Sequence, residues 1–74
     1  MVTVENIRKI SASGNGIHTA VLDLIVSTSA ELPELGAVVG GMAVDAATIA
    51  FIIQEDKWCT LDADGTWYTS GAEG

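Results

Sequence analysis

Residues 48–70, TIAFIIQEDKWCTLDADGTWYTS, decide the fold that this sequence predicts. The stretch contains both tryptophans and the only phenylalanine, tyrosine and cysteine of the chain. Near its end, aromatic and β-branched residues flank the tetrapeptide DADG at 62–65, and such residues favour pleated strands. Within DADG, Asp64-Gly65 tolerates the positive φ angles that a short hairpin loop needs. The stretch therefore predicts an apolar strand, a polar break and a closing β-hairpin.

Residues 45–54, DAATIAFIIQ, allow two interpretations. A helix would place Ile49, Ile52 and Ile53 on one stripe, with Asp45 as the N-cap. A strand would have mostly apolar side chains on both faces, like a central strand that is covered on each side. The density of Ile, Thr and Phe, together with the neighbouring hairpin, favours the strand.

Residues 2–10, VTVENIRKI, mix two periods. The first two valines are two positions apart, as in a strand, whereas Val4, Ile7 and Ile10 are three apart, which would suit a helix. The β-branched content favours a strand for this segment.

Residues 17–28, IHTAVLDLIVST, alternate cleanly, which predicts a half-buried strand. The loop SGNG at 13–16 would join this strand to the first one as a hairpin. The nearly all-apolar face of the predicted strand consists of His18, Ala20, Leu22, Leu24, Val26 and Thr28.

The remaining segments complete a β-rich domain. Residues 29–36 cannot form a central strand because Pro33 lacks a backbone donor. Residues 37–44, AVVGGMAV, predict a short strand broken by a bend or bulge at the glycines. We therefore predict one domain over residues 1–74, all-β or mostly β, with residues 71–74 as a frayed tail. Its architecture would be a small antiparallel sheet or sandwich of five to six short strands that ends in a β-hairpin.

The charge balance limits the possible partners. Ten acidic residues against three basic ones give a net charge of −7. This excess argues against binding to a nucleic-acid backbone or to an anionic membrane surface, since both attract Lys and Arg. The acids are dispersed, which is typical of solvated surface positions.

The length and composition favour self-association. A chain of 74 residues that is 49% hydrophobic has more apolar surface than a small monomer easily hides. Cys59 is the only cysteine, so neither an intrachain disulfide nor a thiol-rich metal site can supply the missing stability. The N-terminus lacks the apolar core of a signal peptide, so we expect a protein made in the cytoplasm.

No motif for catalysis or for metal binding is complete. His18 and Cys59 are single residues, whereas a nucleophilic site or a zinc site requires several partners at suitable positions. DADG at 62–65 is similar to the start of a calcium loop, but the turn interpretation accounts for all four residues. We therefore expect no enzyme activity, no cofactor and no metal.

The aromatic side chains are the candidate contact residues. Trp58, Trp67 and Tyr68 could form a stacking platform for a sugar or a base, or they could pack across strands in the core. Whichever of them is exposed becomes the first candidate for an interface, and Phe51 in the preceding strand belongs to the same set.

A pattern of short motifs resembles a known group of proteins. The pattern is an apolar strand, then Glu31-Leu32-Pro33, then IAFIIQ at 49–54, then DGTWY at 64–68. It resembles small structural proteins of tailed bacteriophages and prophages, including head fibre and head-decoration proteins. Those proteins often show a D/E-L-P loop, a GS-x-A-x-V-I-D strand and a terminal D-G-x-W-Y hairpin. Ala47-Thr48 departs from the pattern, because Gly-Ser is common at that place.

The resemblance implies a non-enzymatic role in the virion or in its assembly. We expect homo-oligomers, with a trimer as one form, and contacts with other virion proteins. The protein would be found in the cytoplasm of the bacterial host during assembly and later in the virion. The alternative is a small β-rich module that uses its aromatic hairpin to hold a glycan or a peptide.

Overall fold

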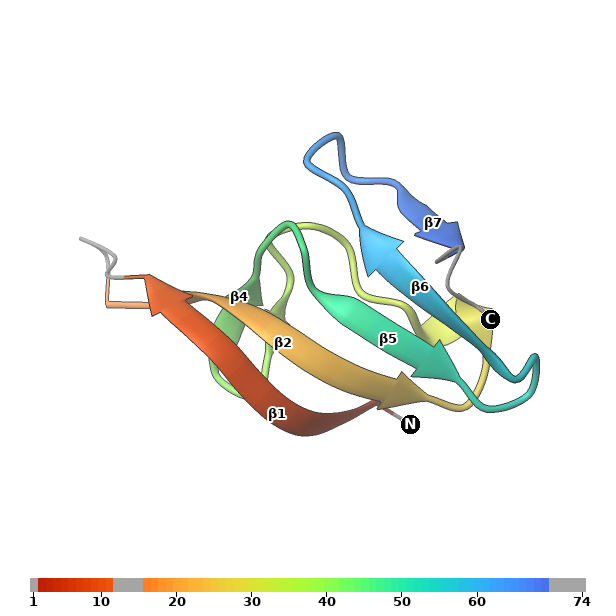
Figure 1. Cartoon of the computed structure of the whole chain (residues 1–74). Helices are drawn as coiled ribbons and strands as arrows, with labels where there is room; N and C mark the ends of the chain where they lie inside the picture. The colour runs from red at the N-terminus through yellow and green to blue at the C-terminus, as the bar shows by residue number, and fades with distance from the viewer. Residues whose placement is uncertain (1, 12–15, 70–74) are drawn as a thin grey trace.

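This computed structural model describes residues 2–11 and 16–69. Most of them belong to one mixed sheet of seven strands (Figure 1). The mostly β class predicted from the sequence is therefore confirmed. The 3-10 helix η1, Ser29–Glu31, follows the second strand. The strands are β1 Val2–Ser11, β2 Thr19–Val26, β3 Val38–Val39, β4 Met42–Val44, β5 Ile49–Ile52, β6 Lys57–Leu61 and β7 Trp67–Thr69. The residues predicted to be a frayed tail, 71–74, lie outside the described part.

Strand β2 is the centre of the sheet. Strand β1 pairs with it in antiparallel fashion along its whole length, as the predicted N-terminal hairpin requires. Strands β4 and β5 follow one another along the opposite edge of β2, and both run parallel to it. The remaining pairs, β3–β4, β5–β6 and β6–β7, are antiparallel. The sequence predicted an antiparallel sheet and did not indicate the two parallel pairings.

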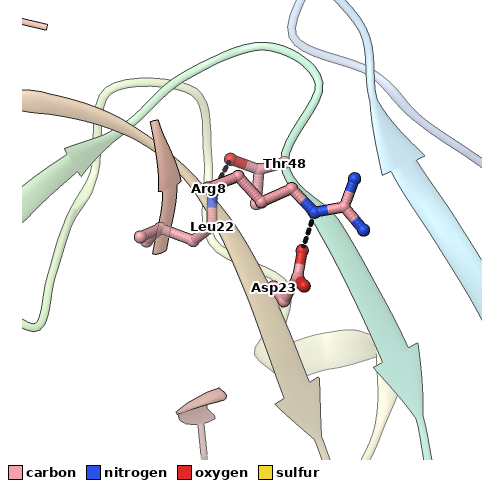
Figure 2. Close-up of polar contacts among 4 residues, drawn as sticks. All are labelled: Arg8, Leu22, Asp23 and Thr48. Carbon is pink, nitrogen blue, oxygen red and sulfur yellow. Dashed lines mark hydrogen bonds and ion pairs between the residues drawn. The ribbon is translucent and has the colours of Figure 1, made fainter. Parts of the chain in front are cut away.

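The break between β4 and β5 is closed by a side chain. The chain turns at residues 45–48, where Ala47 has a φ of 77°. At this gap the Leu22 backbone N–H donates to Thr48 Oγ1 at 3.1 Å (Figure 2). Thr48 is fully buried, so its hydroxyl replaces a backbone acceptor that the interrupted strand does not supply.

Two bulges explain the mixed periodicity of β1. Its pairing with β2 shifts register at Glu5 and at Arg8. Each bulge inserts one extra residue, so apolar residues three positions apart still reach the same face. The register places Val4, Ile7 and Ile10 opposite inward-facing residues of β2. The strand interpretation of this segment was correct, and the helix-like spacing reflects the bulges.

The core lies on one face of the sheet, which we call the inner face. The alternating pattern of β2 buries all four of its inward apolar residues, as the sequence predicted. Leu32 from the 29–36 loop, which also carries the buried Pro33, and Trp67 from β7 pack against this core. The fully or nearly fully buried apolar side chains are Ala20, Leu22, Leu24, Val26, Val44, Ala50, Ile52, Cys59 and Leu61.

Residues 38–44 differ from the prediction. The glycines produce a complete reversal of the chain, because β3 and β4 pair as an antiparallel hairpin around them. Gly40 and Gly41 both have positive φ, which glycine adopts without a steric penalty. A Cβ at Gly40 would lie 3.4 Å from Val4 Cγ2, so this hairpin also packs closely against β1. Residues 45–54 contain strand β5, so the strand interpretation of this segment was correct and the helix interpretation was wrong.

Candidate functional site

The strand alternation divides the four candidate aromatic residues between the two faces. Three of them lie on the face of the sheet opposite to the core, namely Phe51, Trp58 and Tyr68. Trp67 lies on the inner face, where it packs against both groups of core residues. The structure therefore places three of the predicted contact residues on one face of the sheet, where Phe51 and Trp58 are in contact, and assigns the fourth to the core.

Two aromatic rings are in contact on the face opposite to the core. Phe51 and Trp58 are direct neighbours across β5 and β6, with ring centroids 5.1 Å apart and planes tilted by 54°. Tilted pairs at this distance contribute about 0.5–1.5 kcal/mol beyond the area they bury. Trp58 is still 44% exposed and Tyr68 is 49% exposed, so both can contact another molecule.

The apolar surface continues across the sheet beyond the aromatic residues. On β2 and β5 the outward side chains alternate with the core residues and are half-buried. They have no covering layer within the described residues, because the core and the 29–36 loop occupy the inner side. We call this surface the outer face, and it consists of Val21, Ile25, Ile49, Phe51, Trp58 and Tyr68.

One ion pair interrupts the outer face. Arg8, at the second bulge of β1, places its Nε 2.6 Å from Asp23 Oδ1 (Figure 2). This oxygen is buried and has no hydrogen bond of good geometry among the described residues, so the ion pair compensates for its burial. Arg8 and Asp23 are not among the contact residues predicted from the sequence. The signal was a carboxylate between Val21 and Ile25 on the outward row of β2.

Trp67 joins two distant parts of the sequence. Its indole Nε1–H donates to the Pro33 carbonyl oxygen at 2.7 Å, across 34 positions of the chain. The loop that contains Glu31-Leu32-Pro33 is therefore held against the closing hairpin. Two of the motifs that carry the resemblance to phage structural proteins meet at this hydrogen bond.

The turn between β6 and β7 uses both oxygens of Asp64. Oδ1 accepts from the Thr66 backbone N–H at 2.9 Å, and Oδ2 accepts from the Tyr68 hydroxyl at 3.0 Å. The Thr66 bond, followed by the Tyr68 bond, lowers the pKa of Asp64. The same bond to Asp64 raises the pKa of Tyr68. These contacts fit the turn interpretation of DADG, and no group of three metal-ligating side chains lies together in residues 2–11 and 16–69.

His18 and Cys59 lie towards opposite ends of β2. His18 precedes β2, is exposed, and has its Nδ1 3.3 Å from the Ser11 carbonyl oxygen. Cys59 belongs to the core group that includes Val26 at the end of β2. Burial raises the pKa of the Cys59 thiol, which disfavours the reactive thiolate. The arrangement does not supply a nucleophile with an adjacent base.

Comparison with known proteins adds no relative. Protein-family models, curated proteins and solved structures gave no match to this chain. No helix in the described residues is long and apolar enough to cross a membrane.

Proposed function

We propose that this chain is a non-enzymatic structural or assembly protein of a tailed phage or prophage virion, similar to head fibre or head-decoration proteins. The observation that carries the proposal is the outer face, an apolar sheet surface with two half-exposed aromatic residues and no covering layer in the described part of the chain. Such a surface on a small protein marks a site of association. Copies of the chain would bury it against one another, as a trimer or another homo-oligomer, and other virion proteins would bind the assembly.

The geometry gives physical reasons for the motifs that carry the resemblance. The proline loop and the D-G-x-W-Y hairpin are joined by the Trp67–Pro33 hydrogen bond. The Gly-Ser of the common pattern corresponds to Ala47-Thr48, where the backbone has a positive φ and a hydroxyl accepts the Leu22 N–H. These positions therefore have structural roles, which supports a relationship of fold with those proteins.

The mechanism would be burial of the outer face. Apolar surface contributes about 25 cal/mol per Å² when it leaves water, before the entropic costs of association are subtracted. The only carboxylate in the outward row of β2, Asp23, is already paired with Arg8, so the face has little charge to desolvate. The acids of residues 29–36, 53–56 and 62–65 lie outside the strands, where they keep free subunits apart.

The test is the mass in solution, measured by light scattering coupled to size exclusion over a dilution series. We expect a dimer or larger oligomer in the wild type, and dissociation in Trp58→Thr, which keeps strand propensity but removes the ring. Leu35→Ala, which truncates an exposed apolar residue in the 29–36 loop, is the matched control and should behave as wild type. A wild-type chain that stays monomeric at every concentration would contradict self-association.

The half-exposed rings of Trp58 and Tyr68 also favour a second candidate, a module that holds a glycan or a peptide. Aromatic rings on a sheet surface stack well against sugar rings and peptide side chains. This function predicts a stable monomer whose tryptophan fluorescence changes on titration with oligosaccharides or peptides. Trp58→Thr should abolish the change, because Trp67 is hydrogen-bonded on the inner face.

A further inference from the structure

Strand β1 forms one edge of the sheet (Figure 1). Among the described residues it pairs with β2 alone, so no strand lies along its second edge. The backbone N–H and C=O groups along such an edge can pair with another extended chain. Strand β1 has ten residues, whereas the edge strands β3 and β7 have two and three. It therefore offers the longest edge for a partner in the described part of the chain.

The hydrogen bonds of β2 show which backbone groups of β1 point to the unpaired edge. The Leu22 N–H donates to Thr48, on the side of β2 that faces away from β1. The carbonyl oxygens of Ala20 and Val26 accept hydrogen bonds on the same side. In an antiparallel pair, the residues opposite these positions direct their own backbone groups away from β2. Those residues of β1 are Val2, Val4, Ile7 and Ile10.

The two bulges of β1 give these groups an unusual spacing. Val4, Ile7 and Ile10 are three positions apart, whereas the corresponding groups of a regular strand are two positions apart. A regular strand would therefore lose its register with this edge after one bulge. A second copy of β1 has the same spacing. In antiparallel orientation it places Ile7 opposite Ile7 and Val4 opposite Ile10, with two residues between these pairs on both strands.

This register also brings apolar side chains together. Ile7 is 42% exposed and Ile10 is 53% exposed, although both lie on the inner face, as Val4 does. Side chains that oppose one another across antiparallel strands lie on the same face and are close enough to pack. Each exposed isoleucine therefore gains an apolar neighbour from the second copy.

Opposite charges meet in the same register. Residues 5–6 of one copy lie between the paired positions and face residues 8–9 of the second copy. Glu5 is therefore within reach of Lys9 of the second copy, and the two-fold symmetry repeats this contact. Both side chains are exposed, and neither has an ion-pair partner within residues 2–11 and 16–69. The charges therefore favour this orientation of the two strands.

We propose that two copies of this chain pair through the unpaired edges of β1, as antiparallel strands centred on Ile7. The contact is isologous, with a two-fold axis at Ile7, and it joins the two sheets into one. The outer faces of both copies then lie on the same side of the joined sheet. The inference goes beyond the proposed function, because the edge of β1 is separate from the outer face.

The first test places a cysteine on the two-fold axis, in full-length chains that carry Cys59→Ala. Residues opposite one another in such a pair have Cα atoms about 5.5 Å apart, which suits a disulfide. With oxidised glutathione as the oxidant, Ile7→Cys should form a covalent dimer at least about tenfold faster than Ile10→Cys. Two Ile10→Cys thiols are separated by six positions, about 20 Å. A mixture of Val4→Cys and Ile10→Cys chains should cross-link with each other, because these positions are opposite.

The second test changes the charges in the Ile7→Cys chain. Glu5→Lys should slow the cross-linking about tenfold, because it repels Lys9 of the second copy. The combination of Glu5→Lys and Lys9→Glu should return the rate to within about threefold, because the charges are exchanged. The control is Asp62→Lys, which makes the same change in net charge on the exposed β6–β7 turn and should not slow the reaction.

Circular dichroism confirms that each variant is folded. If Ile7→Cys cross-links no faster than Ile10→Cys while Trp58→Thr still lowers the mass of the oligomer, the edge pairing is wrong and the outer-face contact stands. If Ile7→Cys cross-links as expected while Trp58→Thr leaves the mass unchanged, the edge pairing stands and the outer-face contact is wrong. Equal slowing by Glu5→Lys and Asp62→Lys would contradict the register.

Discussion

Thr48 satisfies a buried backbone donor through its side chain. The Leu22 N–H has the Thr48 hydroxyl as its acceptor at the gap between β4 and β5, and Thr48 is fully buried. Thr48→Val keeps the shape but leaves this N–H unpaired, so we expect a loss of about 1–3 kcal/mol in the free energy of unfolding. Urea denaturation followed by tryptophan fluorescence measures it.

Thr48→Ser is the matched control, because serine keeps the hydroxyl and loses one methyl group. It should cost clearly less than the valine variant. If valine proves as stable as wild type, the hydrogen bond at this gap contributes nothing to the stability.

Ala47 is strained where the common pattern of the resembling proteins has glycine. Its φ of 77° lies in the left-handed region, which costs a residue with a Cβ about 1–2 kcal/mol. Ala47→Gly should therefore raise the free energy of unfolding by about 1 kcal/mol, after the extra entropy of the unfolded glycine is subtracted. Ala46→Gly, one position earlier and without a positive φ, should lower it. Equal effects of the two substitutions would contradict the strain.

The pKa of Tyr68 depends on its hydrogen bond to Asp64 in the DADG turn. The hydrogen bond to Asp64 raises the pKa of Tyr68, and this is the only tyrosine, so the ultraviolet absorbance of tyrosinate follows it directly. Asp64→Asn should lower this pKa towards the model-peptide value of about 10. Asp62→Asn, which removes a weaker cause, should lower it less. An unchanged Tyr68 pKa in Asp64→Asn would exclude the bond in solution.

The two shifts act on stability in opposite pH ranges. The pKa of Tyr68 is raised on folding, so its contribution is present below the unfolded pKa and is lost as the pH rises through the folded pKa. The pKa of Asp64 is lowered, so its contribution is present above the unfolded pKa and is lost as the pH falls through the folded pKa. Both groups are exposed, so solvent screening keeps these contributions small.

At the scale of elements, the closing hairpin depends on Trp67. Its ring packs against both core groups, and its N–H holds the 29–36 loop through Pro33. Trp67→Ala should cost about 3–5 kcal/mol, enough to unfold a domain of this size. Circular dichroism and thermal melting measure the loss. Trp67→Phe keeps most of the packing and loses the hydrogen bond, so it should be destabilised less than the alanine variant and remain folded. A folded, equally stable alanine variant would contradict this role.

The sequence predicted the elements that depend on local chemistry. The alternation of β2 follows from its side-chain period, and the DADG turn follows from its turn residues. The strand at 49–52 follows from the density of Ile, Thr and Phe and from the neighbouring hairpin, because its period alone also allowed a helix. The bulges of β1 were not predicted, and the chain reversal at Gly40 and Gly41 was predicted only as a bend or bulge within one strand. A bulge or a tight reversal looks like an irregular period in a single sequence, and only the register of the partner strand identifies it.

At the scale of the whole molecule, the parallel pairings and the sorting of the aromatic residues could not be predicted. Whether β4 and β5 run beside β2 depends on contacts between segments that are distant in the sequence. The hairpin pattern predicted which side chains of each strand share a face. Only the position of the core shows that Trp67 points inward and Trp58 outward. The strand patterns predicted which residues of each strand alternate between the two faces. The outer face could not be predicted, because it depends on which strands become neighbours in the sheet.

Net charge should control the association of the whole molecule. Each copy carries a net charge of −7 near neutral pH, so copies repel one another while the apolar outer face attracts them. Lowering the pH towards the pI of about 4.1 protonates carboxylates and weakens the repulsion, so the apparent dissociation constant should fall. Light scattering at a series of pH values measures it.

Raising the salt concentration at neutral pH is the control, because screening weakens the same repulsion without protonating any group. It should shift association in the same direction as acid. Trp58→Thr should remain dissociated under both conditions, since it retains the charge but lacks the ring that the contact buries. If acid and salt both dissociate the wild-type oligomer, charge attraction rather than burial of the outer face holds it together, and the proposed mechanism is wrong.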